Sequence, residues 1–325
     1  MSEKLDISRF YVISVISNPV RYHRRYDLYW KFKKHMQDVG GKLITVECQF
    51  GNRGFVLTER DNPFHVQLRT SEEVWHKENM INVAINYLSQ LDPDWQYVAW
   101  IDADIFFHRQ DIIHETAQQL QHYDIVQMFS HAIDSGPKGE PIQTHSSFMW
   151  NYLQNNRYPP QGPGQGGYYN YSKGFWHPGY AWAARRSALS KLMLLDTAAM
   201  GAGDHHMALA LIGCAEKSLP RGISKGYRAS VMNWQHISIN EIKKNVGYVD
   251  GMITHAWHGK KRDRKYRERW DILTTNKFDP YLDLVRDHQG LWRLNMNNGE
   301  RSIRLRDDFR QYFRSRNEDS IDHED

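Results

Sequence analysis

Two aspartates, Asp102 and Asp104, interrupt an otherwise apolar run at Tyr97–His108 (YVAWIDADIFFH). The stretch Val98–Ile101 has the continuous apolar character of a strand that is buried on both faces of a parallel sheet. Open α/β folds bind ligands at the carboxyl ends of such strands, and carboxylates placed there need a compensating cation. We therefore predict a divalent metal site at these two aspartates, with a solvated turn at the strand end as the alternative.

A short motif of this kind arises by chance in a chain of this composition, so its surroundings decide its meaning. A second Asp-x-Asp, Asp92-Pro-Asp94, lies in LSQLDPDWQY, where the proline and the polar flanks are typical of a loop. The apolar strand before Asp102 and Asp104 makes that pair, and not Asp92 and Asp94, the candidate metal site.

The segment Ile253–Lys261 (ITHAWHGKK) combines two histidines with a glycine and two lysines. A neutral imidazole is a metal ligand, a glycine lets the backbone approach a phosphate closely, and a lysine neutralises the charge of a diphosphate. The alternative is a strand end at the surface followed by a solvated basic helix. The presence of an aspartate pair elsewhere in the chain favours the metal and diphosphate hypothesis.

The segment Gly201–Met207 (GAGDHHM) places Asp204 after two glycines and before an apolar stretch. An aspartate that opens a helix commonly serves as its N-cap, and this is the simpler explanation. A carboxylate at a helix start in a cleft could equally accept a proton from an attacking hydroxyl group. Both roles of Asp204 remain open from the sequence.

Aromatic side chains gather in Phe175–Ala188 (FWHPGYAWAARRSA), where a His-Pro-Gly turn is expected to precede a helix carrying Arg185 and Arg186. Such a surface could stack an acceptor, although aromatic residues near a turn more often belong to the core. The candidate acceptor-binding residues are Trp176, Tyr180 and Trp182.

The segment Asn155–Gly174 is rich in glycine, proline and tyrosine and has no periodicity. A loop of this length inside a compact domain is usually a lid or a binding loop, and a disordered insertion is the alternative. We expect it to close over the substrates, since closure excludes water from a reactive donor.

The remaining pattern predicts alternating strands and helices, which is typical of a parallel sheet with right-handed crossovers. Gly40-Gly41 ends the first helix, and a long connection precedes the second. The expected strands are Phe10–Ile16, Lys42–Glu47, Val98–Ile101 and Asp124–Ser130, and the expected helices cover 27–36, Trp75–Leu88 and His114–His122.

The amino-acid composition excludes several classes of protein. The 325 residues are 40% hydrophobic, which excludes wholesale disorder, and the formal net charge is only +4. The first residues, MSEKLDISRF, lack the apolar core of a signal peptide, and no apolar run approaches the length of a membrane span. With two cysteines far apart in sequence, a cytoplasmic protein without integral membrane association is expected.

Taken in order, these motifs resemble those of nucleotide-sugar-dependent glycosyltransferases with the GT-A fold. The resemblance is closest to inverting enzymes of the family 2 type, including uncharacterised bacterial and phage members. It rests on the first strand and its loop, Asp-Ala-Asp, Gly-x-x-Trp-Ala-x-Arg-Arg, Gly-Asp-His-His and a late His-Gly-Lys, and covers roughly Phe10 to Lys261. It implies a Rossmann-type, mostly parallel sheet flanked by helices, with a helical and loop-rich C-terminal extension.

The resemblance also implies roles for single residues. It puts Asp204 at the position of the catalytic base, although that motif usually ends in Glu-Asp. Two histidines follow here, so His205 is a second candidate base. The implied metal ligands are Asp104, Asp102 and His258, and the implied nucleotide-sugar contacts are Asn18, Arg21, Glu47, Lys77, Asn82, Asp102 and Lys260.

We therefore expect a hexosyl- or pentosyltransferase that uses Mn²⁺ or Mg²⁺ and a UDP- or GDP-sugar. Its catalytic domain is predicted at 8–261, and 262–325 is predicted as a basic extension packed on it or following it. Inversion at the anomeric carbon is expected, but no second carboxylate is placed well enough in the sequence to exclude retention. The acceptor and the oligomeric state are left open.

Two other functions compete with this hypothesis. Nucleotidyl or phosphoryl transfer also uses aspartates and a metal, but Ser17–Val20 lacks a phosphate-binding glycine loop. Nucleic-acid binding is suggested by Lys260–Arg269, where seven of ten residues are basic. A phage-type glycosyltransferase acting on a modified DNA base would combine that charge with the same active site.

Overall fold

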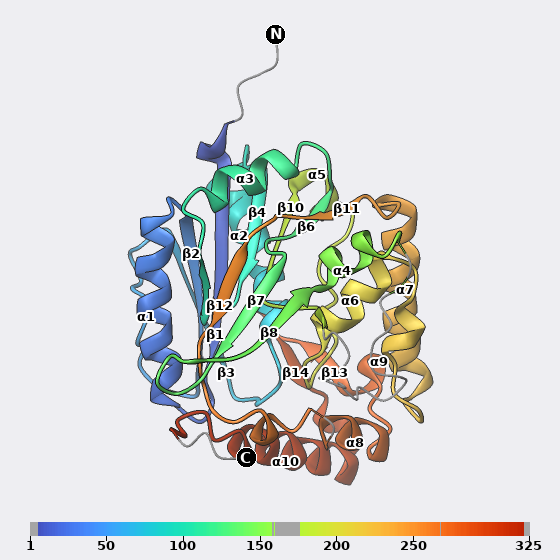
Figure 1. Ribbon diagram of the computed structural model, residues 1–325. Coiled ribbons are helices and arrows are strands. Elements are labelled where there is room, and N and C mark those ends of the chain that lie inside the picture. The colour runs from blue at the N-terminus through green and yellow to red at the C-terminus, as the bar shows by residue number, and fades with distance from the viewer. Residues whose placement is uncertain (1–5, 158, 160–175, 267, 322–325) are drawn as a thin grey trace.

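A computed structural model describes residues 6–157, 159, 176–266 and 268–321 of the chain. Its centre is a seven-stranded sheet in the order β11-β6-β10-β4-β1-β2-β3, in which β10 alone of these strands runs antiparallel to its neighbours (Figure 1). The prediction of an α/β protein with a mostly parallel sheet flanked by helices is confirmed. The strands are β1 (Phe10–Ser17), β2 (Lys42–Phe50), β3 (His65–Thr70), β4 (Tyr97–Ile101), β6 (Ile125–Gln127), β10 (Ala181–Arg185) and β11 (Val246–Tyr248).

Both faces of this sheet are buried, as the unbroken apolar runs in β1 and β4 indicate. Successive side chains of a strand point to opposite faces. In β1, Phe10 and Val12 therefore pack in the core beneath α1 and α3, whereas Tyr11 and Ile13 pack in the core with α2. The helices of the parallel part are α1 (His23–Asp38), α2 (Lys77–Leu91), α3 (Ile112–Gln119), α6 (Gly203–Leu211) and α7 (Lys225–Glu241).

A second sheet of five short strands lies beside the carboxyl end of β4 and has the order β5-β12-β7-β8-β9. The sequence analysis did not predict it. Its register sets Ile105 and Asp134 on either side of His255. This sheet therefore carries the segments that follow Asp104 and precede His258. Its strands are β5 (Ile105–Phe107), β7 (His131–Ser135), β8 (Pro141–Ser147), β9 (Trp176–His177) and β12 (Met252–His255), and α4 (Phe148–Gln154) follows β8.

One local prediction needs correction, and another falls largely outside the described residues. Arg185 does not lie in a helix, because Ala181–Arg185 forms β10 between β4 and β6, and only a short α5 (Arg186–Leu189) follows. The small side chains of Ala183 and Ala184 are completely buried there. The predicted loop Asn155–Gly174 lies largely outside the described residues.

The C-terminal segment, predicted as an extension from residue 262, packs across one end of the molecule (Figure 1). It shares one hydrophobic core with the main sheet, since Trp270 and Phe309 belong to the same cluster as Tyr11 and Trp100. Its elements are α8 (Glu268–Thr275), α9 (Pro280–Asp283), β13 (Leu284–Arg286), β14 (Trp292–Leu294) and α10 (Glu300–Ser315).

A strap at 316–320 follows α10 and ties the C-terminal segment to the start of α1. The Asp319 carboxylate accepts hydrogen bonds from the backbone N–H groups of His23 and Arg24, at 3.0 and 2.9 Å. It thereby satisfies two orphan donors of α1, whose own N-cap residue makes no side-chain bond. The indole of Trp257 donates to the backbone carbonyl of Ser320 at 2.8 Å, so the strap also contacts the loop that follows β12.

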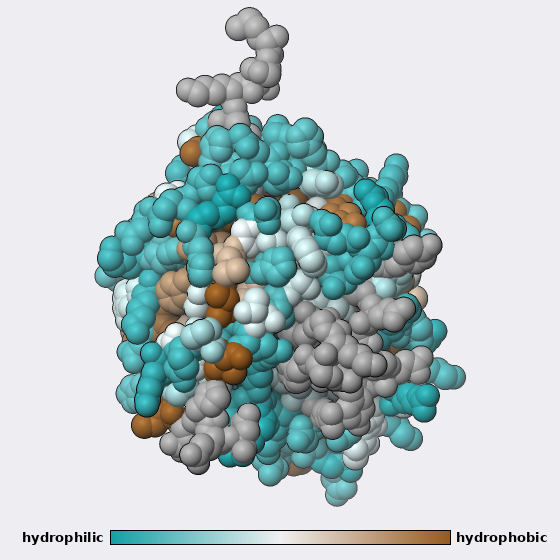
Figure 2. All heavy atoms as spheres, in the orientation of Figure 1, coloured by the Kyte–Doolittle hydropathy of each residue, from teal (hydrophilic) through white to brown (hydrophobic). Residues whose placement is uncertain are grey.

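The surface is mainly hydrophilic on the face drawn in Figure 2, where hydrophobic side chains occur in small separate groups. Among the described helices, none combines the length and the apolar character that crossing a membrane requires.

Candidate functional site

A cavity of about 230 Å³ opens at the carboxyl ends of β1 and β4, where the sequence placed the aspartate pair. The start of α2, the start of α6, the loop after β12 and the C-terminal segment complete its wall. The wall is dense in charge of both signs. Its carboxylates are Glu78, Asp102, Asp104, Asp134, Asp204 and Glu318, and its cationic side chains are Arg25, Lys77, Lys261, Arg264, Arg269 and Arg316.

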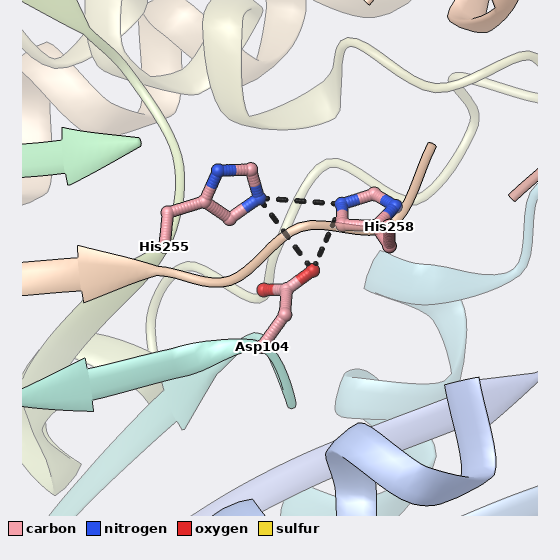
Figure 3. Close-up of side chains that lie close together, drawn as sticks. All are labelled: Asp104, His255 and His258. Carbon is pink, nitrogen blue, oxygen red and sulfur yellow. Dashed lines mark hydrogen bonds and ion pairs between the residues drawn. The ribbon is translucent and has the colours of Figure 1, made fainter. Parts of the chain in front are cut away.

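Three side chains in this wall converge on one point: Asp104, His255 and His258 (Figure 3). Asp104 lies in the turn between β4 and β5, His255 ends β12, and His258 lies in the loop that follows. The Oδ2 atom of Asp104 is 3.1 Å from Nε2 of His258 and 3.7 Å from Nε2 of His255, and the two Nε2 atoms are 3.2 Å apart. The pairing of β12 with β5 brings these distant segments together.

These separations suit a shared cation. Ligands that bind one metal ion at about 2.0–2.2 Å lie about 2.8–3.6 Å apart in tetrahedral or octahedral geometry. The 3.1 and 3.2 Å separations fall within this range, and the 3.7 Å separation lies at its edge. The second carboxylate oxygen of Asp104, Oδ1, is buried without a hydrogen-bond partner among the described residues. Two imidazoles and one carboxylate favour Mn²⁺, Fe²⁺ or Zn²⁺ over Mg²⁺, which prefers oxygen ligands. The residues present therefore fit a transition-metal ion.

A buried carboxylate orients the first imidazole. Nδ1 of His255 lies 2.9 Å from Oδ1 of Asp134, which leaves Nε2 facing Asp104 and His258. Histidines that ligate metals commonly donate their other ring N–H group to a carboxylate in this way. Burial alone would lower the pKa of His255, but the Asp104 and Asp134 carboxylates overcome it and raise the pKa to about 9.

The other imidazole has a different environment. Burial and the nearby Arg264 charge lower the pKa of His258 to about 4, against the pull of Asp104. His258 is therefore neutral at physiological pH and can offer a lone pair to a cation. Burial would raise the pKa of Asp104, yet the two imidazoles hold it well below its usual range, so this carboxylate is charged.

The structure separates the two predicted aspartates. Asp102 is not part of the metal-type cluster, which consists of Asp104, His255 and His258. It forms an ion pair with Lys77, whose Nζ lies 2.5 Å from Oδ1. Lys77 is the first residue of α2 and lines the cavity, so the predicted nucleotide-sugar contacts Asp102 and Lys77 neutralise each other there. The place expected for Asp102 beside Asp104 and His258 is taken by His255. In the sequence, His255 was recognised only as one of two histidines.

The structure also corrects the capping role considered for Asp204. Helix α6 begins one residue earlier, at Gly203, and its N-cap is Ala202, in the left-handed conformation with φ 72°. Asp204 lies in the first turn, where a negative charge is favoured. Its carboxylate accepts from the backbone N–H of His205 at 2.8 Å and lies against Gly179, at a position that a β-carbon would obstruct.

The start of α6 also packs closely against α2. A β-carbon on Gly203 would come within 2.6 Å of the Glu78 carboxyl carbon, so this close approach requires glycine. Glu78 is 4% exposed. Burial raises its pKa to about 8, against the effect of Lys77 and with that of Asp204, so Glu78 is mainly protonated at neutral pH.

The second candidate base, His205, lies flat against Trp176, with ring centroids 5.7 Å apart and an interplanar angle of 3°. Burial lowers the pKa of His205 to about 4, and Asp204 opposes the shift. Its Nδ1 is buried and has no hydrogen-bond partner among the described residues. His205 lines the cavity and is a neutral imidazole at physiological pH.

Of the three predicted acceptor-binding aromatics, Tyr180 lines the cavity, and Trp176 and Trp182 do not. The Tyr180 ring lies between His177 and His255, at centroid distances of 3.6 and 4.7 Å. Its hydroxyl donates to Asp134 at 2.9 Å. Trp182 belongs to the core, and its indole N–H donates to the backbone carbonyl of Pro178.

Several predicted nucleotide-sugar contacts lie outside the cavity wall, where their polar groups bind the protein itself. Glu47 accepts hydrogen bonds from the backbone N–H groups of Val56, Leu57 and Thr58, and from the Thr58 hydroxyl. Asn82 exchanges two hydrogen bonds with the backbone of Leu194. Both side chains therefore stabilise backbone segments of the protein through hydrogen bonds.

Asn18, Arg21 and Lys260, the other predicted contacts, also lie outside the cavity wall. Asn18 exchanges two hydrogen bonds with the backbone of Tyr22, which closes a turn after β1. Arg21 is exposed in that turn and is not among the cavity-lining residues. Lys260 is buried outside the cavity wall, whereas its neighbour Lys261 lines the cavity and pairs with Asp134 at 2.6 Å.

Cations that were not assigned to the site from the sequence come from the C-terminal segment and from α1. Arg316 and Arg25 both bind Glu318, which is 0% exposed and lies 3.9 Å from Nδ1 of His258. Gly259 makes this approach possible, because a β-carbon there would meet the backbone of Asn317 at 2.8 Å. The strap at 316–320 therefore packs directly against the loop that carries His258.

No family model and no curated protein matches the sequence. Solved structures do match over most of the chain. One, described as a nucleotide-diphospho-sugar transferase from Desulfovibrio desulfuricans, is 13% identical, with 94% of this chain and 98% of that chain covered and a TM-score of 0.31.

Two further solved structures are similarly distant. A glycosyltransferase involved in glycosylation of the major capsid of PBCV-1 is 9% identical over 82% of this chain and 98% of that chain, with a TM-score of 0.33. A mannose-1-phosphate geranyltransferase from Thermus thermophilus is 12% identical over 75% of each chain, with a TM-score of 0.32. Similarities this distant do not assign a function, which must come from the site itself.

The metal-type cluster leads to a prediction about ion binding. Asp104→Asn and His255→Ala should each weaken Mn²⁺ binding by about 100-fold or more, because each removes a ligand, while removal of an outer-shell partner typically costs about 10–100-fold. Asp102→Asn, the matched control, should keep nearly wild-type affinity, since its carboxylate pairs with Lys77. Titration calorimetry measures both effects, and Mg²⁺ should bind more weakly than Mn²⁺. Unchanged affinity in His255→Ala would show that the cluster is not the metal site.

The buried Glu78 leads to a prediction about stability and pH. The folded protein holds this proton up to a pKa of about 8, whereas the unfolded chain releases it near the ordinary glutamate pKa of 4.5. Between these values the folded state binds more protons, so stability should fall as pH rises, by up to about 1 kcal/mol per pH unit. Glu78→Gln should flatten this dependence in urea unfolding series, and the exposed Glu59→Gln should not. Equal slopes for the wild type and Glu78→Gln would contradict the burial effect.

Proposed function

We propose that this protein is a metal-dependent glycosyltransferase that moves a sugar from a nucleoside-diphosphate sugar to an acceptor hydroxyl group. The observation that carries the proposal is the convergence of Asp104, His255 and His258 in the wall of a cavity that is also lined by lysine and arginine side chains. A diphosphate needs both a divalent cation and fixed positive charge to leave with its electron pair. The domain predicted at 8–261 and the C-terminal segment would both contribute to this site.

The donor side of the site would be the region around the metal-type cluster. Lys261 and Arg264 follow His258 closely in sequence, line the same cavity and carry fixed charge. Arg264 is 7% exposed, and the only hydrogen bond from its guanidinium to a described residue is to the Tyr266 hydroxyl. A bound Mn²⁺ would supply a Lewis acid that neutralises the developing diphosphate charge. These two cations would hold the diphosphate in place.

The acceptor side would be the start of α6. Asp204 would take the proton from the acceptor hydroxyl as its oxygen forms a bond to the anomeric carbon, while the bond from that carbon to the diphosphate breaks. Such a direct displacement inverts the anomeric centre. His205 is the alternative base, and its neutral imidazole beside Asp204 would otherwise help to orient the acceptor. A UDP- or GDP-linked hexose or pentose fits this chemistry equally.

The two competing functions have less support. The turn after β1, where a phosphate-binding loop would stand in a phosphoryl transferase, is closed by the Asn18 side chain and contains proline in place of glycine. In the basic segment Lys260–Arg269, Lys261, Arg264 and Arg269 line the cavity and do not form an outward-facing patch. This arrangement favours small anionic substrates over a nucleic-acid backbone.

Donor turnover tests the proposal. With Mn²⁺, the wild type should hydrolyse at least one UDP- or GDP-sugar slowly in the absence of an acceptor, because water can replace the acceptor hydroxyl. A chelator should abolish this reaction, and Asp104→Asn should reduce it by about 100-fold or more, since transition-state charge would lose its main counter-ion. Release of nucleoside diphosphate measures the rate. Failure of both UDP- and GDP-sugars to bind or react would refute the proposal.

The base assignment leads to a separate prediction. Asp204→Asn retains the shape of the side chain and a hydrogen-bond acceptor for the His205 N–H, so its melting temperature and Mn²⁺–UDP affinity should stay near wild type. Sugar transfer should fall by about a hundredfold to ten-thousandfold, because an amide cannot accept the proton. Asp61→Asn, on the exposed surface, serves as the control. If Asp204→Asn transfers normally, the base is not Asp204, and His205→Ala becomes the next variant.

A further inference from the structure

Arg269, at the start of α8, is a buried cation without a counter-ion among the described residues. It is 8% exposed and lines the cavity, yet its guanidinium makes no hydrogen bond or ion pair with a described residue. Its Nε is buried and unpartnered, and its guanidinium lies 5.1 Å from the ring centre of Tyr266 and 5.5 Å from that of Trp270. The aromatic rings hold the guanidinium in place while its polar edge remains available.

A buried guanidinium without a carboxylate is costly unless a bound anion compensates for it. The buried arginine of the C-terminal strap differs in this respect, since Arg316 binds Glu318 at 2.5 Å. An arginine fork suits planar or tetrahedral oxyanions, to which it donates two parallel hydrogen bonds. The guanidinium of Arg269 is therefore suited to bind an oxyanion in the cavity.

The location of Arg269 separates it from the metal-type cluster. Its Nη1 atom lies 3.2 Å from where a β-carbon on Gly201 would stand, in the turn that leads into α6 and Asp204. Its ring neighbour Trp270 contacts His206, two residues after Asp204. The cations next to His258 in the chain are Lys261 and Arg264 instead. Arg269 thus belongs to the side of the cavity where the acceptor would be activated.

We infer that the acceptor carries an acidic group, a phosphate or a carboxylate, which Arg269 binds while Asp204 faces the attacking hydroxyl. The inference rests on the proposed function for the assignment of this side to the acceptor. It narrows the acceptor to an anionic small molecule or glycan end, such as a sugar phosphate or a uronic acid. Neutral acceptors would leave Arg269 buried without a counter-ion among the residues that the structure describes, and the site would select against them.

Inorganic phosphate and acetate serve as probes of this anion site, each titrated at constant ionic strength into protein saturated with Mn²⁺ and UDP. With the donor site filled, at least one of these anions should still raise the melting temperature of the wild type. Arg269→Gln should bind that anion about ten-fold to a hundredfold more weakly, the range expected for a lost charged hydrogen bond. Whether phosphate or acetate responds distinguishes a phosphate ester from a carboxylate.

The controls separate this site from the donor site and from a folding defect. Arg262→Gln removes a guanidinium from the same segment whose side chain is 58% exposed, and it should behave as wild type. Arg269→Lys keeps the charge without the fork and should recover part of the affinity, while melting without added anion reports the fold. Equal anion binding by the wild type and Arg269→Gln would overturn the inference, as would a loss confined to Mn²⁺–UDP binding. If UDP does not bind the wild type, the proposed function fails, and titration without it still decides whether Arg269 binds anions.

Discussion

The buried carboxylate of Asp134 is the contact on which the geometry of this site depends. Three groups bind it: the Tyr180 hydroxyl at 2.9 Å, Nδ1 of His255 at 2.9 Å and Nζ of Lys261 at 2.6 Å. Its position in β7, paired in register with the end of β12, sets the orientation of the His255 ring. A charge this deeply buried is stable only while its partners remain in place. One imidazole of the metal-type cluster, the Tyr180 hydroxyl and one cavity cation thus share a single carboxylate.

Backbone conformation supports the same site. Tyr180 and Ala202 both line the cavity and both have positive φ, 77° and 72°, which is uncommon for residues other than glycine. Each such conformation costs about 1–3 kcal/mol and persists only where the surroundings determine it. The surroundings of both are tightly packed, since the Tyr180 hydroxyl donates a hydrogen bond to Asp134, and Gly203, next to Ala202, packs against Glu78.

The main sheet could be predicted from local pattern, because β1, β2 and β4 are long enough to show continuous apolar runs. The second sheet could not, since strands such as HAIDS and MITH are short and mixed in polarity, and MITH pairs only with strands more than a hundred residues away. Asp104 and His258 could be named as candidate ligands from the sequence, because each lies next to a recognisable element. His255 was visible in the sequence, but its role depends on the register of β12, which the sequence does not reveal.

Polar residues were harder to assign than strands. Glu47, Asn82 and Asn18 are of the types that bind nucleotides, yet each satisfies backbone groups of the protein. A side chain that can bind a ligand can equally bind main chain, and only the three-dimensional neighbours distinguish the two. Conversely, Arg264 and Arg269 lie in a run of charge that is typical of a solvated helix, and here both are buried in the cavity wall.

The strap at 316–320 has a consequence for the order in which the protein folds. Its contacts join residues nearly 300 positions apart, as between Arg25 and Glu318, and such distant pairings form late because closing a long loop costs chain entropy. On a ribosome, the strands of the central sheet emerge well before this strap and can pair without it. The sheet and its aspartates would then form first, with the cavity still open at one end. The wall of the cavity would be complete only after the strap packs against Gly259.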